Sequence, residues 1–226
     1  MTLIKGKRYR KEAEQVSEKP LSLAEAVAKI KSFNTTKFDQ TVVCTFWLGI
    51  DPKQSDQIVR GAISLPHGIG KQKKVIAFCE GSDVDAAKQA GAIEVGCDEL
   101  IAKIQGGWAD FDVAIASNKV MGKVGKLGRV LGPQGKMPSP KNGTVTGDVA
   151  TAVREFAAGK VEFKNDAGGN VHMVVGKVSF DQQKLMDNID AVISYIKRIK
   201  PVSSKGTYIK KVCVSAAMSP GILVAV

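Results

Sequence analysis

The sequence predicts a protein of mixed class, α/β and α+β, in which one domain is inserted into another. Three observations lead to this prediction. The chain has 226 residues, which suits two ordinary domains better than one. Between residues 74 and 159, short apolar strands alternate with helices, as in a parallel sheet covered on both faces. On either side of this stretch, the strands alternate apolar and polar residues, which is typical of antiparallel sheets.

The first flank is expected to begin with a helix after Pro20. Ser22 and Glu25 have the spacing of a capping box, and apolar residues follow on one helical stripe: Leu23, Val27 and Ile30. Two β-rich runs come next, at 41–50 and 58–65. The prolines and glycines of 65–70 then interrupt any regular element.

The middle of the chain repeats a strand-then-helix unit. Strands are expected at 75–79, 92–95 and 111–116, and helices at 84–90, 98–104, after Ser117, and at 149–158. The second flank returns to strands, at 161–164 and 171–178, with a hairpin turn at 166–169. A long amphipathic helix over 180–198 and strands at 208–214 and 222–226 follow.

These elements predict a discontinuous outer domain, 1–66 plus 160–226, and an inserted domain, 67–159. The hinge between them is expected at Pro66, His67 and Gly68 on one connection and at Gly159 on the other.

The charge of the chain is far from neutral. Lys and Arg number 33 against 22 Asp and Glu, a formal net charge of +11. Such an excess attracts polyanions, nucleic acid first and an acidic membrane surface second. Residues 1–11, with five basic side chains including Lys5, are expected to form a basic arm rather than a secretory signal, and no segment is expected to cross a membrane. The four cysteines, at 44, 79, 97 and 213, lack any short pairing and predict reduced thiols in a cytosol-like compartment.

Enzyme motifs are absent where they would be expected. After the first parallel strand, residues 80–83 offer one glycine and two acids, which would repel a pyrophosphate. Gly70-Lys71 lacks the first glycine of a phosphate loop, because Leu65 stands there. The two histidines, His67 and His172, have no ligand at zinc spacing. We therefore predict no catalytic residue, metal or cofactor.

The most unusual stretch, 113–147, contains no acid. It carries six basic residues: Lys119, Lys123, Lys126, Arg129, Lys136 and Lys141. On a helix the first three would lie within about 60° of one another, next to a face without side chains made by Gly122, Gly125 and Gly128. This arrangement predicts close approach of a nucleic-acid backbone, although a solvated lysine face on a marginal helix is the alternative. The following loop, 132–144, holds three prolines and three glycines and is expected to be fixed in shape.

The sequence resembles the ribosomal protein L1 family over almost its whole length. The motifs are Gly6-Lys7-Arg8-Tyr9, Thr36-Lys37-Phe38-Asp39-Gln40-Thr41, Leu48-Gly49-Ile50-Asp51-Pro52-Lys53, Leu65-Pro66-His67-Gly68, Gly106-Gly107-Trp108, Phe111 to Ala116, Met121 to Gly128, Leu131 to Lys141, Gly176-Lys177 and Lys205-Gly206. The resemblance implies a split β-α-β antiparallel-sheet domain with an inserted Rossmann-like parallel-sheet α/β domain. It also implies a non-enzymatic constituent of the large ribosomal subunit that binds large-subunit rRNA.

The same resemblance implies a place in the mobile stalk, help for deacylated tRNA leaving the exit site, and repression of the protein's own operon mRNA. The protein would be monomeric off the ribosome, away from membranes, and located with ribosomes in the cytoplasm or in the matrix or stroma of a bacterium-derived organelle. The implied rRNA contacts are Lys37, Phe38, Thr41, Lys53, Lys164, Asp166, His172, Ala217, Met218 and Ser219. The six basic residues of 113–147 would meet tRNA or rRNA backbone.

Two departures from the family pattern bear on affinity. The family usually has Thr-Met-Gly where this chain has Ala217-Met218-Ser219, and the missing hydroxyl removes a hydrogen bond worth about 1 kcal/mol. In the inserted domain, Gln134 replaces the usual Arg and Lys136 the usual Leu. Two other functions compete with RNA binding: a nucleotide-dependent α/β enzyme with a basic appendage, and a peripheral membrane protein. The failed phosphate motifs oppose the first, and the lack of a basic amphipathic helix with Trp or Phe on its apolar side opposes the second.

Overall fold

The computed structural model describes residues 6–33, 35–81 and 83–226, and it divides into two compact units. The first unit joins 1–70 to 163–226, and the second unit is 71–162. One unit contains an antiparallel sheet and the other a parallel sheet, so the predicted fold class is confirmed.

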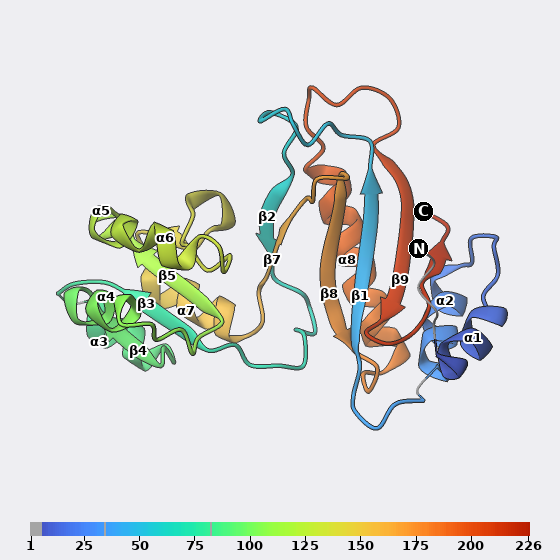
Figure 1. The fold of residues 1–226 in the computed structure, drawn as a ribbon, viewed down its shortest axis with the longest axis horizontal. Helices are drawn as coiled ribbons and strands as arrows, with labels where there is room; N and C mark the ends of the chain where they lie inside the picture. The colour runs from blue at the N-terminus through green and yellow to red at the C-terminus, as the bar shows by residue number, and fades with distance from the viewer. Residues whose placement is uncertain (1–5, 34, 82) are drawn as a thin grey trace. The chain divides into compact units, whose positions relative to one another are not determined.

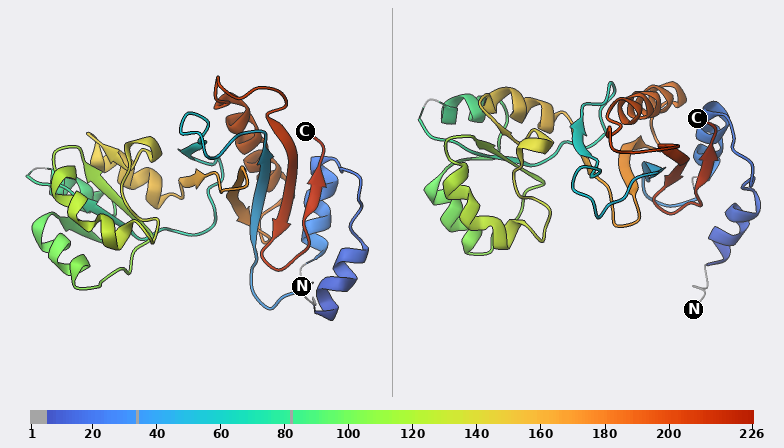
Figure 2. Two further views of the ribbon diagram at one scale, coloured as in Figure 1. Left: turned by 45° about the horizontal axis from the view of Figure 1, so that its top comes forward. Right: turned by 90° about the horizontal axis from the view of Figure 1, so that it is seen from above.

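The first unit is built on a four-stranded antiparallel sheet in the order β10-β9-β1-β8 (Figure 1). Its strands are β1 (Thr41–Leu48), β8 (Asn170–Lys177), β9 (Ile209–Ala216) and β10 (Ile222–Val224). Helices α2 (Leu23–Ser32) and α8 (Gln182–Arg198) both pack on one side of this sheet, as the view from above in Figure 2 shows. The capping box at the start of α2 forms as predicted, because Ser22 accepts from Glu25 N and Glu25 accepts from Ser22 N.

Strand β1 shows why only one face is covered. Val42, Cys44, Phe46 and Leu48 are buried against the helices, while the intervening side chains remain half-buried or exposed. The stripe of α8 that meets them is the predicted one: Leu185, Ile189, Val192, Ile193 and Ile196. The opposite face of the sheet has no helix packed on it from the described part of the chain.

The predicted turn at 166–169 forms, but the hairpin pairing of 161–164 with 171–178 is wrong. Strand β7 (Val161–Lys164) pairs with β2 (Arg60–Ile63) in a separate two-stranded sheet, whereas β8 pairs with β1. A single bridge, Asn165 with Val171, links the two segments. The reason is visible in Asn165, whose backbone and side chain both hydrogen-bond to Val59 and so hold the end of β7 beside β2.

The basic arm also needs correction. Residues Lys7–Glu14 form helix α1, and Lys5 lies outside the described residues. The helix depends on tertiary contacts, since Glu12 is buried and accepts hydrogen bonds from Arg8 and Thr35. All four cysteines are free in the structure; Cys44, Cys79 and Cys97 are buried and Cys213 is half-buried, and burial raises the pKa values of Cys44 and Cys213. The cytosol-like compartment stays a prediction.

The second unit contains the parallel sheet β4-β3-β5-β6. Its strands are β3 (Val75–Phe78), β4 (Glu94–Gly96), β5 (Val113–Ser117) and β6 (Val145–Thr146), and its helices are α3 (Asp83–Gln89), α4 (Asp98–Gln105) and α7 (Val149–Ala157). Helices α3 and α7 lie on one face of the sheet, and α4 lies on the other with the segment 121–131 (Figure 2). Ser82, in the stretch 80–83 considered above, lies outside the described residues.

The helical stretch after Ser117 is broken into three short pieces rather than continuous. They are α5 (Met121–Val124), the 3₁₀ turn η1 (Gly125–Leu127) and α6 (Gly128–Leu131). Glycine at every third position destabilises a long helix, which explains the breaks. Its apolar side is nevertheless the predicted one: Val120, Val124, Leu127 and Leu131 are all buried.

One buried polar side chain connects three parts of the first unit. The register of β1 against β8 skips Val175, which leaves the Val175 carbonyl without a strand partner. Asn188 of α8 donates to that carbonyl at 2.8 Å and to the Gly68 carbonyl at 3.1 Å, and it accepts from His67 N at 3.1 Å. The predicted hinge residues His67 and Gly68 are thus fastened to α8, and Gly159 directly follows the last residues of α7. The hinge assignment itself stays a prediction.

Asn188→Ala should lower the free energy of unfolding of the first unit by about 1–3 kcal/mol, because the buried Val175 carbonyl and two partly buried backbone groups, of His67 and Gly68, lose their partner. The measurement is urea unfolding of the full chain carrying Trp108→Phe, so that Trp47 reports on the first unit alone. Ser194→Ala, an exposed change on the same helix, is the matched control and should stay within about 0.5 kcal/mol of the parent. Equal effects of the two changes would contradict this role of Asn188.

Candidate nucleic-acid interface

Two exposed apolar side chains lie near one end of the antiparallel sheet. Phe38 is 50% exposed and precedes β1, and Met218 is 51% exposed and follows β9. Their loops are joined directly: Gln40 accepts from Met218 N at 2.9 Å, and Ala217 N donates to the Thr41 carbonyl at 3.0 Å. Large apolar side chains that remain exposed on a fixed backbone are available to pack on a partner.

Helix α1 also holds the loop that carries Met218, through the side chain of Arg8. Arg8 donates to the Met218 carbonyl at 2.8 Å and to Thr35 Oγ1 at 3.0 Å, and it also pairs with buried Glu12 at 3.1 Å. Because Gln40 is buried and Arg8 is only partly exposed, these contacts hold the Met218 loop in place without covering its side chain. The loop is therefore preorganised before any partner binds.

The residues beside Met218 have different surroundings. Ala217 is exposed and points no polar group outward. The Ser219 hydroxyl, in contrast, is buried; it accepts from Ala216 N at 2.9 Å and lies 3.2 Å from the Pro220 carbonyl. Ser219 therefore stabilises the turn, and its side chain is not presented to a partner.

Lysines surround this end of the sheet. Lys37 is exposed, and Lys177 donates to Thr41 Oγ1 at 2.9 Å, so the hydroxyl of Thr41 is already engaged. The nearby carboxylate of Asp39 is engaged too, by Ser179 N at 3.1 Å and Ser179 Oγ at 2.8 Å. Asp39 keeps its negative charge, but its oxygens are hydrogen-bonded within the chain.

The remaining predicted rRNA contacts lie farther along the sheet and in the turns beyond it. On the open face, His172 hydrogen-bonds to Thr45 across β8 and β1 at 3.1 Å. The Asp166 carboxylate accepts from Gly168 N, Asn170 N and Asn170 Nδ2, bonds that hold the turn 166–169 and lower the pKa of Asp166, the Asn170 side chain most of all. Lys53 and Lys164 are exposed, the first in the turn after β1 and the second at the end of β7.

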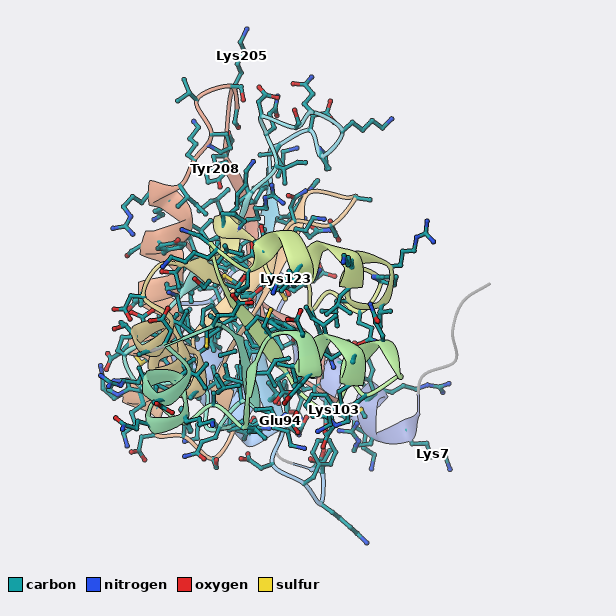
Figure 3. All side chains as sticks on the ribbon, turned by 90° about the vertical axis from the view of Figure 1, so that its left-hand side faces the viewer. Lys7, Glu94, Lys103, Lys123, Lys205 and Tyr208 are labelled. Carbon is teal, nitrogen blue, oxygen red and sulfur yellow. The ribbon has the colours of Figure 1, made fainter. Side chains whose placement is uncertain are left out.

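In the second unit, Lys123 is not free. Its ammonium group donates to Glu80 at 2.7 Å and to Asp98 at 3.2 Å, two acids that lie 43 and 25 residues away in sequence. These hydrogen bonds raise the pKa of Lys123 and lower the pKa of Glu80. Figure 3 shows Lys123 among the side chains of this unit. Since two carboxylates surround one ammonium group, this corner does not attract phosphate.

Lys136 is also engaged, because it donates to the Ala109 carbonyl at 2.9 Å and lies 4.8 Å from the centre of the Phe111 ring. Four further basic residues in this part of the unit, Lys119, Lys126, Arg129 and Lys141, are exposed, as Lys123 is in its ion pairs. Beside them, Gly122, Gly125 and Gly128 face open space: a Cβ atom built at any of the three would meet no neighbouring atom within 4 Å. Packing within the chain therefore does not require glycine at these positions.

Glu80, Cys97 and Asp98 are the one group in the described ranges whose side chains could jointly hold a metal ion, since their ligand atoms lie within 4.8 Å of one another. The Lys123 ammonium group already bonds both carboxylates of that group. The arrangement is therefore explained as an ion-pair cluster.

Comparison with known proteins decides the family. A model of the ribosomal protein L1p/L10e family matches residues 30–220. The chain belongs to this family. It is 51% identical over 219 residues to the large ribosomal subunit protein uL1 of Cutibacterium acnes, covering 96% of this chain and 94% of that protein. It is 49% identical to the uL1 protein of Thermobifida fusca, covering 96% of this chain and 93% of that protein.

Membership of the ribosomal protein L1p/L10e family confirms the resemblance and, with it, the prediction of a non-enzymatic RNA-binding protein of translation. In the part of the chain that the structure describes, helices long and apolar enough to span a bilayer were not found.

Three side chains at the candidate interface were not singled out by the sequence reasoning: Arg8, Lys177 and Trp47. Arg8 and Lys177 stood inside motifs of the family, Gly6 to Tyr9 and Gly176-Lys177, but nothing local assigned them a task. Trp47 occupies an outward position of β1, and the alternation of apolar and polar residues in that strand could have shown that it faces away from the core. Each acquires its role from a segment more than 130 residues away.

Proposed function

We propose that this chain binds large-subunit rRNA through its first unit and forms part of the mobile stalk of the large ribosomal subunit. The observation that supports this most directly is the braced, exposed pair Phe38 and Met218. Lys37 and Lys177 lie at the same end of the sheet, where Glu12 is paired with Arg8 and Asp39 is hydrogen-bonded to Ser179. Apolar side chains on a fixed loop can pack on bases and sugars, and the surrounding lysines can take phosphates. Of the residues inferred from the family, Lys37, Lys53, Lys164 and His172 are exposed and suited to direct contact.

We further propose that the second unit contacts exit-site tRNA through its backbone and assists its release. The open glycine face beside Lys119 and Lys126 supports this role, because a phosphate backbone can approach a surface without side chains closely. This contact would lack sequence specificity, since lysines and backbone amides meet phosphates rather than base edges.

Repression of the protein's own operon mRNA follows if that mRNA offers the first unit a structure similar to its rRNA site. Both RNAs would then use Phe38 and Met218, and they would compete for one surface. A competition titration between the rRNA stem-loop and the mRNA leader tests this extension directly, because independent binding of the two would contradict it.

Phe38→Ala and Met218→Ala should each weaken binding of the rRNA stem-loop about tenfold, within the ~1–3 kcal/mol expected for a lost stacking contact. The dependence of affinity on salt should stay unchanged, because no phosphate partner is removed. The measurement is a set of titrations of the full chain at several ionic strengths. Ile93→Ala, which removes an equally exposed apolar side chain from the second unit, is the control. If folded Phe38→Ala and Met218→Ala proteins bind the rRNA stem-loop as tightly as the parent, the proposed interface is wrong.

Ala217→Thr should tighten rRNA binding about fivefold, because it restores a hydroxyl beside Met218, worth ~1 kcal/mol. The control is Ala217→Val, which has nearly the same shape but cannot donate a hydrogen bond. If the valine variant gains as much affinity as the threonine variant, packing rather than hydrogen bonding is responsible.

Replacing Lys119 and Lys126 together by Gln should weaken retention of exit-site tRNA on ribosomes about fivefold at low salt, and less at high salt. The matched variant changes Lys123 and its two acidic partners together: Lys123→Gln, Glu80→Gln and Asp98→Asn. It should retain tRNA at least as well as the parent, because it removes an ion-pair cluster rather than a phosphate contact. Equal losses in the two variants would mean that Lys123 does contact RNA.

A further inference from the structure

The uncovered face of the antiparallel sheet carries one large aromatic side chain, Trp47 of β1. It is 41% exposed, whereas its neighbour Phe46, on the covered face, is fully buried. The position is outward in the alternation of β1, so burial in the core of the first unit does not explain the indole.

Two consecutive lysines flank this ring. Lys210 Nζ lies 4.8 Å and Lys211 Nζ 5.7 Å from the centre of the Trp47 ring. Successive residues of a regular strand point to opposite faces, but the register between β1 and β9 shifts between Trp47 and Leu48. This bulge brings both ammonium groups to one indole and concentrates positive charge around it.

Among the strand residues that the structure describes, the rest of the open face carries no acid. Beside Trp47, the outward residues of the strands are Thr41, Val43 and Thr45 of β1, Asn170, His172 and Val174 of β8, and Lys211, Cys213 and Ser215 of β9. The nearest carboxylate along this face, Asp166, is held by the amides of its own turn and lies 3.7 Å from His172. A flat, partly apolar surface with cations at the rim and without free acids fits RNA better than an ordinary protein partner.

We propose that Trp47 is a second stacking site for the same RNA, where it takes an unpaired base while Lys210 and Lys211 bind the phosphates on either side. This inference rests on the proposed rRNA-binding function and adds a contact at the other end of β1. Six residues of strand separate Thr41 from Trp47, roughly 20 Å at about 3.4 Å per residue. The bound RNA must therefore run along the open face from the Phe38–Met218 end and present an unstacked nucleotide over the indole.

The experiment uses the full chain with Trp108→Phe, which leaves Trp47 as its sole tryptophan. On titration with the protein-free rRNA stem-loop, stacking should quench the fluorescence of Trp47 in parallel with binding. Trp47→Ala should weaken binding about tenfold and Trp47→Phe much less, because phenylalanine keeps an aromatic face. Lys210→Gln with Lys211→Gln should reduce the slope of log affinity against log salt by about 2, whereas Lys197→Gln with Lys200→Gln, which removes two exposed charges from the end of α8, should not.

The outcomes separate this inference from the function on which it rests. If the stem-loop binds and Phe38→Ala weakens it, but Trp47 is neither quenched nor needed, the stacking site is wrong and the rRNA function stands. If Trp47→Phe loses as much affinity as Trp47→Ala without any quenching in the parent, the ring has a structural role and the inference is overturned. Quenching that occurs on whole large subunits but not on the RNA fragment assigns the surface to a ribosomal protein neighbour, which also overturns it. Failure of the parent chain to bind the stem-loop at all contradicts the proposed function itself.

Discussion

Strand β1 hydrogen-bonds to β8 along one edge and to β9 along the other, and both partners come from the last third of the chain. The first unit therefore cannot form until residues more than 120 positions apart have met. The second unit lies within that connection in the sequence and carries its own parallel sheet and core. The pairing of β1 with β9 also creates the candidate interface. Phe38 lies just before β1 and Met218 just after β9, so the two side chains come together only when these strands pair.

One-sided coverage of this sheet has a chemical consequence. Helices α2 and α8 pack on the apolar face, so the opposite face keeps its half-buried threonines, its histidine and its tryptophan in contact with solvent. Strands β1 and β9 are held by hydrogen bonds on both edges and β8 by its pairing with β1, and the loops at the end of the sheet are fixed by Arg8 and Gln40. A partner that binds here meets a surface that is already ordered, so little conformational entropy is lost on its side of the interface.

The second unit shows how misleading a count of charges can be. Six basic residues and no acid between 113 and 147, together with the family resemblance, predicted that all six would meet a nucleic-acid backbone. In the folded unit, Lys123 bonds Glu80 and Asp98, and Lys136 bonds a carbonyl and lies near an aromatic ring. The cationic surface is accordingly narrower than the sequence suggests. What survives is the open glycine face with the exposed lysines beside it.

The sequence by itself determined the elements whose pattern is local. Alternation in β1, the apolar stripe of α8, the capping box of α2 and the buried side of 120–131 all follow from residues a few positions apart, and the structure has them as predicted. Family motifs added the outline of the candidate interface, whereas the two-domain organisation already followed from the pattern of strands and helices. Only the tertiary structure decided that β7 pairs with β2, that residues 7–14 are helical, that Ser219 turns inward, and which lysines are already occupied. The physical reason is the range of the forces involved. Backbone periodicity acts between covalent neighbours, whereas the partner of a charge or of a buried amide is set by contacts between segments that the fold alone brings together.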